Sequence, residues 1–131
     1  MIDSIILILR ICLAIVFLGH GLQAAFGVFS GPGIDGFSKM LSSLGFKAPV
    51  LWAYVSAYTQ LVAGIFLLIG FCSRFAAFSI LIFMLVAVLK VHASKGFFIQ
   101  AGGFEYNFVI ICICIILIMT GSGKFGITPK L

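Results

Sequence analysis

The chain has 131 residues, of which 63% are hydrophobic and only 8% are charged. This balance is the reverse of what a water-exposed surface needs, and it excludes a soluble monomer. The net charge of +5 comes from eight basic and three acidic residues, which form no basic stripe. Nucleic acid is therefore not expected as a partner, whereas anionic membrane lipids are.

Four apolar runs are long enough, or nearly so, to cross a bilayer as helices. They cover residues 4–26, 49–71, 75–91 and 104–120. No linker divides the chain, so residues 1–131 are expected to form a single domain. Arg10 interrupts the first run, which favours a retained helix over a cleaved signal sequence. These features predict an all-α integral membrane four-helix bundle with both termini on one side.

The connection between the first and second runs has a pattern of its own. It contains the helix-breaking cluster Gly31, Pro32 and Gly33. After this cluster, apolar residues recur at three- and four-residue spacing, namely Ile34, Phe37, Met40, Leu41 and Leu44. This spacing predicts a short amphipathic helix between spans one and two, which either lies in the membrane interface or folds back over the bundle.

Basic residues near the ends of the runs are expected at the membrane surface, where they meet lipid head groups. Each side of the membrane would receive four of them, so the positive-inside rule gives no orientation. They are Arg10, Arg74, Lys124 and Lys130 on the side of the termini, and Lys39, Lys47, Lys90 and Lys95 on the other side.

Several polar residues fall inside or beside the apolar runs, where ionisable groups usually face other helices or line a site. His20, His92 and Glu105 come from three different runs at similar depth, Gln60 lies half-way along the second run, and Arg10 lies in the terminal half of the first. One interpretation is a pocket of these residues for an amphipathic ligand such as a quinone, to which a histidine donates a hydrogen bond and a proton. The other is that His92 and Glu105 are simply solvated at the membrane surface.

Arg10 also has two interpretations. Its side chain either snorkels to the nearby surface or reaches between the helices, where it needs a polar partner. The three carboxylates of the chain do not obviously supply that partner. Two residues of the second run, Gln60 and Gly64, share a helix face that another helix or a ligand can approach closely.

Metal and haem sites are not expected. The four cysteines form no CxxC or CxxCH motif and are expected to act as small buried hydrophobic residues; they are Cys12, Cys72, Cys112 and Cys114. His20 and His92 are a conceivable pair of axial haem ligands, but equal depth alone does not make their rings face each other.

The order and spacing of short motifs along nearly the whole chain resemble the DoxX family of small membrane proteins. The motifs are Arg10, His20-Gly21-Leu22-Gln23, Gly31-Pro32-Gly33, Gly45, Gly64, the hairpin from Gly70 to Arg74, His92 with Gly96-Phe97-Phe98, Gly102-Gly103-Phe104-Glu105, and Gly121-Ser122-Gly123.

This resemblance implies a four-helix fold in the bacterial cytoplasmic (inner) membrane with cytoplasmic termini. It also implies a relation to the small subunit of thiosulfate:quinone oxidoreductase and to membrane partners of thiol-redox enzymes. Two positions depart from the family pattern: Ala24 stands where many relatives carry lysine, and Gln60 where many carry glutamate. Gln60 can still form hydrogen bonds, but it cannot exchange a proton near neutral pH.

Three functions are consistent with these features. The first is a membrane subunit of a quinone-linked sulfur or thiol redox complex, with a soluble redox partner, because the chain carries no cofactor-binding motif for complete catalysis. The second is a non-catalytic membrane anchor or lipid-organising assembly protein. The third is a small-molecule transporter, which would require a homo-oligomer to provide alternating access.

Overall fold

The computed structural model describes residues 1–131 and contains helices but no strands. The α-helices are α1 (Ile2–Phe26), α2 (Gly33–Ser43), α3 (Pro49–Ile69), α4 (Ser73–Ala87) and α5 (Glu105–Thr120). A π-helical turn at Val88–His92 and a 3₁₀ turn at Ala93–Lys95 continue α4, and a second 3₁₀ turn covers Ile99–Ala101.

Three helical segments are long and apolar enough to cross a membrane: α1, α3, and α4 together with its continuation to Lys95. The fourth apolar helix, α5, has 16 residues and is shorter. The prediction of an all-helical membrane protein is confirmed, with three helices of spanning length. A short helix, α2, also forms where the spacing of apolar residues predicted one.

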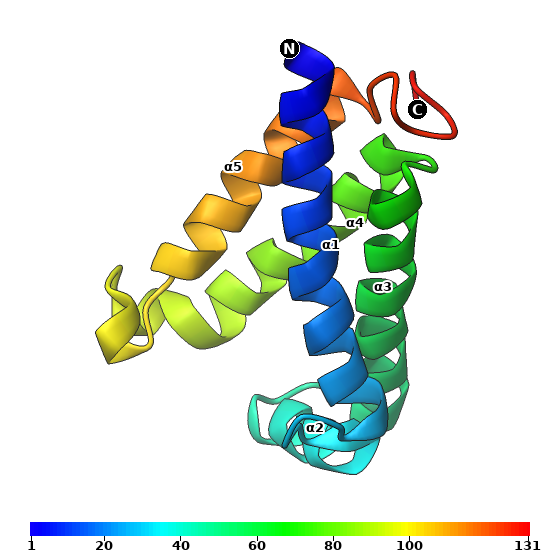
Figure 1. Cartoon of the computed structure of the whole chain (residues 1–131). Helices are drawn as coiled ribbons and strands as arrows, with labels where there is room; N and C mark the ends of the chain where they lie inside the picture. Colours follow the sequence, from blue (N-terminus) through cyan, green and yellow to red (C-terminus); the bar gives the residue numbers. More distant parts are fainter.

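The helices form two antiparallel pairs (Figure 1). α1 and α3 lie side by side, whereas α4 and α5 form a second hairpin that diverges from them away from the termini. Both termini lie at one end of the molecule, and α2 lies across the opposite end of α1 and α3. The loop between α4 and α5 therefore lies well away from α2 (Figure 1).

Local sequence explains where these helices begin and end. Pro49 occupies the first turn of α3, where its missing N–H removes no helical hydrogen bond. α3 ends at Gly70, which adopts the left-handed conformation at φ 71°. This turn reverses the chain within a few residues, so that α4 can begin at Ser73 and run antiparallel to α3.

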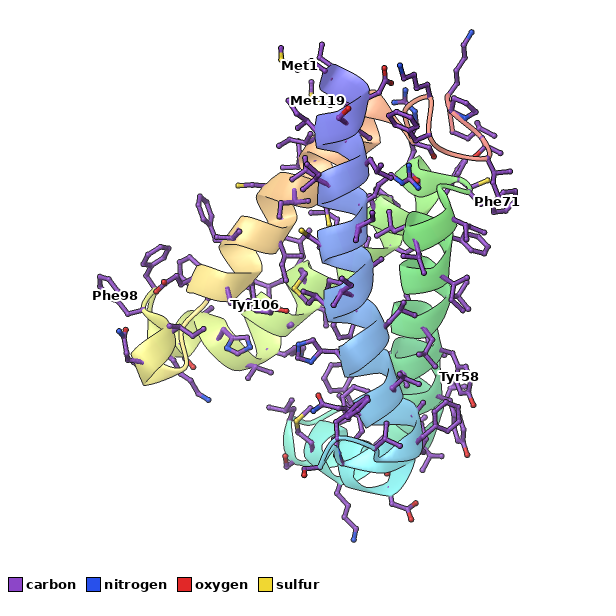
Figure 2. All side chains as sticks on the ribbon, viewed as in Figure 1. Met1, Tyr58, Phe71, Phe98, Tyr106 and Met119 are labelled. Carbon is purple, nitrogen blue, oxygen red and sulfur yellow. The ribbon has the colours of Figure 1, made fainter.

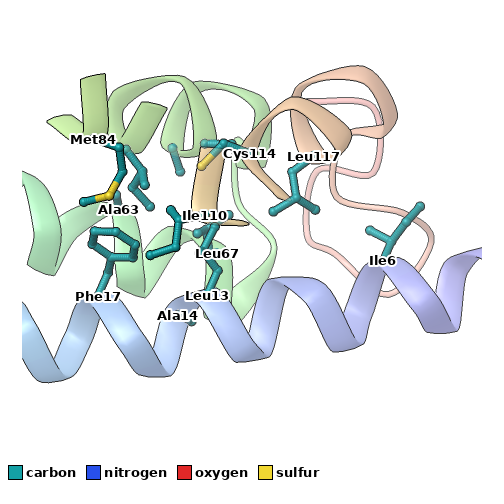
Figure 3. Packing of buried hydrophobic residues seen from close by; sticks show 13 residues of the cluster. Ile6, Leu13, Ala14, Phe17, Ala63, Leu67, Met84, Ile110, Cys114 and Leu117 are labelled. Carbon is teal, nitrogen blue, oxygen red and sulfur yellow. The ribbon is translucent and has the colours of Figure 1, made fainter. Parts of the chain in front are cut away.

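The core lies between α1, α3, α4 and α5, and Figure 3 shows its packing. Leu13 and Phe17 of α1, Leu67 of α3 and Leu117 of α5 are almost completely buried there. In lipid, such packing holds helices together through van der Waals contact more than through the exclusion of water. Large hydrophobic side chains such as Ile8 remain exposed on the outside, as expected for a surface that faces lipid.

Small residues allow α1 and α3 to pack closely. A methyl group placed on Gly64 would lie 2.9 Å from Cγ of Leu18, and one on Gly21 would lie 2.8 Å from Cγ of Leu61. The face of the second span that carries Gly64 is therefore a helix-packing surface, which is one of the two uses predicted for it.

Candidate functional site

Arg10 is buried near the end of the molecule that carries the termini, with only 1% of its surface exposed. Its guanidinium group donates to three backbone carbonyls: Nε to Leu67 O at 2.9 Å, Nη2 to Leu68 O at 3.2 Å and Nη1 to Ser122 O at 2.9 Å. Leu67 and Leu68 lie in the last turn of α3, where carbonyls lack helical partners and the helix dipole is negative. Arg10 therefore points inward, and carbonyls at a helix end replace a carboxylate as its partner.

Arg74, at the start of α4, binds the end of α5 and the C-terminal segment. Its Nη1 donates to the carbonyls of Ile118 and, at 3.0 Å, Met119, and its Nε donates to Lys130 O at 2.9 Å. The prediction that Arg74 only meets lipid head groups is therefore wrong, because its guanidinium group satisfies carbonyls that α5 leaves free at its C-terminus. Both arginines hold helix ends together, and neither lines a cavity described below.

His20 lies near the end of α1 away from the termini and is exposed. Its Nε2 is 3.4 Å from the hydroxyl oxygen of Tyr106 on α5. The two rings have centroids 6.3 Å apart. This contact joins the two diverging helix pairs, and Figure 2 shows Tyr106 between them.

His92 and Glu105 take part in the loop between α4 and α5. His92 Nδ1 is 2.7 Å from the carbonyl oxygen of Gly102, and a carboxylate oxygen of Glu105 accepts a hydrogen bond from the Ile99 backbone N–H at 3.1 Å. The structure thus gives His20, His92 and Glu105 separate partners. Their shared role in ligand binding stays a prediction.

Gln60 and Asn107 are buried polar residues on different helices. Gln60 is 5% exposed, and its Nε2 donates to Ser56 O on its own helix at 3.3 Å. Asn107 is 3% exposed; its Nδ2 donates to Met84 Sδ at 3.3 Å, and its Oδ1 has no hydrogen-bond partner. An unpartnered buried carbonyl oxygen is costly in an apolar interior. Asn107 was not among the residues predicted from the sequence to form a site.

A cavity of about 350 Å³ opens between α2, α3 and α4. Twelve of its 16 lining residues are hydrophobic, and the other four are Ser56, Thr59, Ser79 and Lys90. This volume lies within the range of ligand sites, roughly 300–1,000 Å³, as does the mainly apolar lining with a few polar groups. None of the predicted site residues, which are Arg10, His20, Gln60, His92 and Glu105, belongs to this lining.

Lys90 is the one charged residue of the cavity lining. It lies in the π-helical turn that follows α4, and its Nζ is 5.6 Å from the ring centroid of Phe46 in the connection between α2 and α3. A cation at this distance is attracted by the ring face. The contact between Phe46 and Lys90 therefore joins the α2–α3 loop to the turn that follows α4, at one side of the cavity.

The sequence carried a signal for this site that the sequence analysis did not use. On α4 the lining positions recur at three- and four-residue spacing, from Ser79 through Phe83 and Ala87 to Lys90. This spacing places Lys90 on the same helix face as the apolar lining. Lys90 was expected at the membrane surface with the other basic residues, but it lies in the cavity lining.

The four cysteines lie apart from this cavity. Only Cys114 is buried, within the core; Cys12 and Cys112 are exposed and Cys72 is half-buried. All four are free thiols. The expectation that they are small buried residues therefore holds for Cys114 alone.

Comparison with known proteins assigns the family. The family model described as DoxX matches residues 5–93, which is more than half of the chain and covers most of α1 and all of α2, α3 and α4. This chain belongs to the DoxX family. The matched region contains every lining residue of the cavity between α2, α3 and α4.

Two proteins are similar to this chain over most of its length. A Bacillus subtilis (strain 168) protein named "Putative oxidoreductase CatD" is 26% identical over 123 residues, covering 94% of this chain and 84% of that protein. An uncharacterized protein of Haemophilus influenzae (strain ATCC 51907 / DSM 11121 / KW20 / Rd) is 28% identical over 127 residues, covering 93% of this chain and 80% of that protein. No solved structure matches.

Proposed function

We propose that this DoxX-family chain is a membrane subunit of a quinone-linked oxidoreductase and that it binds the quinone in the cavity between α2, α3 and α4. The observation that carries this proposal is the cavity itself, which is apolar except for three hydroxyl side chains and one lysine. A similar protein is named as an oxidoreductase, which favours redox function over a purely structural one. The proposal makes the chain a subunit and not a complete enzyme.

In the proposed membrane arrangement, α5 is a short fourth span beside α1, α3 and α4. The 16 residues of α5 extend about 24 Å at about 1.5 Å per residue, slightly less than the roughly 30 Å hydrocarbon core. α2 then lies in the membrane interface, with Phe37 and Leu41 buried against the spans and Lys39 exposed. The membrane is the bacterial inner membrane, and the termini are cytoplasmic.

A bound quinone would supply the redox chemistry by accepting two electrons and two protons from a reduced partner. The Lys90 ammonium group would donate a hydrogen bond to a carbonyl oxygen of the ring and favour the negative charge that develops there on reduction. Ser56 and Thr59 would offer hydroxyl groups further inside the cavity. The apolar walls would exclude water from the ring.

The electrons would come from a soluble partner that oxidises a sulfur compound such as thiosulfate or a thiol. The chain has no cofactor-binding motif of its own, so this partner would carry the electron-transfer group. His20, with Tyr106 beside it, lies at the same end of the molecule as the cavity and is a candidate for proton exchange with water.

Binding can be measured with the protein's own fluorescence, because Trp52 is the single tryptophan and lines the cavity. We expect a short-chain benzoquinone to quench Trp52 saturably in detergent, and Lys90→Met to weaken binding by about tenfold, the equivalent of one charge-assisted hydrogen bond. Lys39→Met is the matched control, since Lys39 is an exposed lysine outside the lining. Quenching that rises linearly without saturation would overturn the proposed site.

The same titration separates the cavity from the site expected on the sequence. If the quinone lies in the cavity, His20→Ala and Glu105→Gln bind as tightly as the native chain. Loss of affinity in these two variants, with Lys90→Met unaffected, would instead place the quinone near the α4–α5 loop. If native preparations contain no quinone and show no thiosulfate-dependent quinone reduction with their co-purifying partners, the chain is a non-catalytic anchor.

The membrane arrangement has its own test. The background carries Cys12→Ser, Cys72→Ser and Cys112→Ser, which leaves only the buried Cys114. A cysteine is then introduced at Ser42 on α2 or at Lys124 in the C-terminal segment, both of which are exposed. A membrane-impermeant maleimide added to intact cells stripped of their outer membrane should label Ser42→Cys, and should label Lys124→Cys only after lysis. The opposite pattern would show that the termini face outward.

A further inference from the structure

The cavity between α2, α3 and α4 has a second cavity beside it. This second cavity, of about 400 Å³, lies along α3 and α4 and reaches Phe66 near the end of α3 and Phe75 near the start of α4. Val55, Thr59 and Ser79 line both cavities. Because three residues are shared, the two cavities adjoin, and we refer to the pair as the groove between α3 and α4.

The length of this groove follows from the positions that line it. On α3 the lining residues recur at three- and four-residue spacing from Trp52 to Phe66, and on α4 and its continuation they recur in the same way from Phe75 to Val91. Fourteen residues of helix extend roughly 20 Å at about 1.5 Å each. The groove therefore follows the two helices across most of the apolar thickness of a bilayer.

The two ends of the groove differ in charge. Lys90 and Trp52 lie at the end beside α2, whereas Phe66 and Phe75 lie at the other end. The hydroxyl of Ser79, near the middle, already donates to its own helix at Phe75 O. The single charge thus lies at one end of a mainly apolar groove, and the other polar lining residues, Ser56, Tyr58, Thr59 and Ser79, are uncharged. This matches an amphiphile with a compact polar head and a long apolar tail.

We infer that the groove holds an isoprenoid quinone along its whole length, with the head beside Lys90 and the tail between α3 and α4 as far as Phe66. This inference rests on the proposed function for the head and adds the class of tail and its path. Lipid chains are as apolar as the groove, so the tail gains little free energy on moving in from the bilayer. Affinity therefore resides at the head, and the groove determines where the tail lies.

A photoreactive probe locates the tail directly. The probe is a ubiquinone-type benzoquinone with a diazirine near the far end of its tail, photolysed with the purified protein in lipid nanodiscs. We expect labelling on the segments of α3 and α4 that contain Phe66 and Phe75, and we expect excess unlabelled long-chain quinone to abolish it. Lys90→Met should reduce this competable labelling by about tenfold.

A pair of matched variants tests the path of the tail. Val62 lines only the second cavity and Val109 of α5 lines neither, although both are exposed. Val62→Trp should fill the groove and remove most of the competable labelling at Phe66 while leaving Trp52 quenching by a tail-less benzoquinone unchanged, after correction for the added tryptophan. Val109→Trp, with the same added ring, should leave both signals as in the native chain.

The outcomes distinguish this inference from the proposed function. Saturable quenching of Trp52 with tail labelling spread over lipid-facing residues such as Ile8 would overturn the groove and leave the quinone head site intact. An unchanged labelling pattern in Val62→Trp would likewise overturn the path of the tail through the groove and leave the quinone head site intact. Absence of both saturable quenching and competable labelling would overturn the proposed function as well, with membrane lipid alone filling the groove.

Discussion

The guanidinium group of Arg10 lies directly over the backbone of Gly70: a methyl group on Gly70 would be 2.7 Å from Cζ of Arg10 and in steric conflict with the Cα of Gly126. The turn that ends α3 therefore has two requirements at one position. It needs the left-handed conformation, at φ 71°, and it needs space for a buried cation and a second backbone.

Gly70→Ala tests these two requirements. We expect a loss of about 3 kcal/mol or more in stability, because the left-handed conformation costs roughly 1–2 kcal/mol with a side chain and the steric conflict adds to it. Gly45→Ala is the matched control: Gly45 has φ 89° with nothing within 4 Å of an added methyl group, so it isolates the conformational cost. Thermal unfolding in detergent measures both, and equal shifts would contradict the close contact with Arg10.

Arg10→Met removes the donor that satisfies the carbonyls of Leu67, Leu68 and Ser122. We expect a loss of about 2–4 kcal/mol, since the carbonyls of Leu68 and Ser122 would lose this donor and Leu67 O would keep only its bond from the Gly70 N–H. Arg10→Lys should restore less than half of the loss, because an ammonium group lacks the planar fork that reaches three acceptors. The comparison is made by thermal unfolding against Lys130→Met, an exposed cation in the same region.

Gly64→Leu and Gly19→Leu should shift stability in opposite directions. Leucine is a better helix former than glycine by roughly 0.8–1 kcal/mol, and Gly19 has nothing within 4 Å of an added methyl group. Gly64→Leu gains the same helix propensity, but its side chain would collide with Leu18 and push α1 away from α3. This overpacking costs about 1–3 kcal/mol. Equal melting temperatures for the two variants would show that α1 and α3 do not approach as closely as described.

Asn107→Leu should be neutral or stabilising by about 1 kcal/mol, because it removes a buried carbonyl oxygen that has no partner. Asn107→Asp, of nearly the same shape, should instead destabilise the protein strongly by placing a charge in the core. Thermal unfolding of the two variants measures both effects. A leucine variant that is as unstable as the aspartate variant would indicate that a water molecule or ligand satisfies Asn107 Oδ1.

The sequence by itself determined the helices of this protein. Apolar runs and turn residues depend on local spacing, so the limits of α1 and α3 and the presence of α2 followed from residues close together in the chain. The sequence also placed His20 and Glu105 near one end of the molecule and indicated Gly64 as a site of close helix packing. These properties need only the period of a helix.

Only the tertiary structure decided which polar groups meet. The partners of Arg10 are backbone carbonyls, which every residue carries, so no sequence pattern could identify them. His20 contacts Tyr106 on another helix and His92 contacts the backbone of Gly102 in the α4–α5 loop, whereas the approach of the α2–α3 connection to Lys90 forms one side of the cavity. Both depend on helix packing between distant segments, which residue spacing along a single helix does not specify.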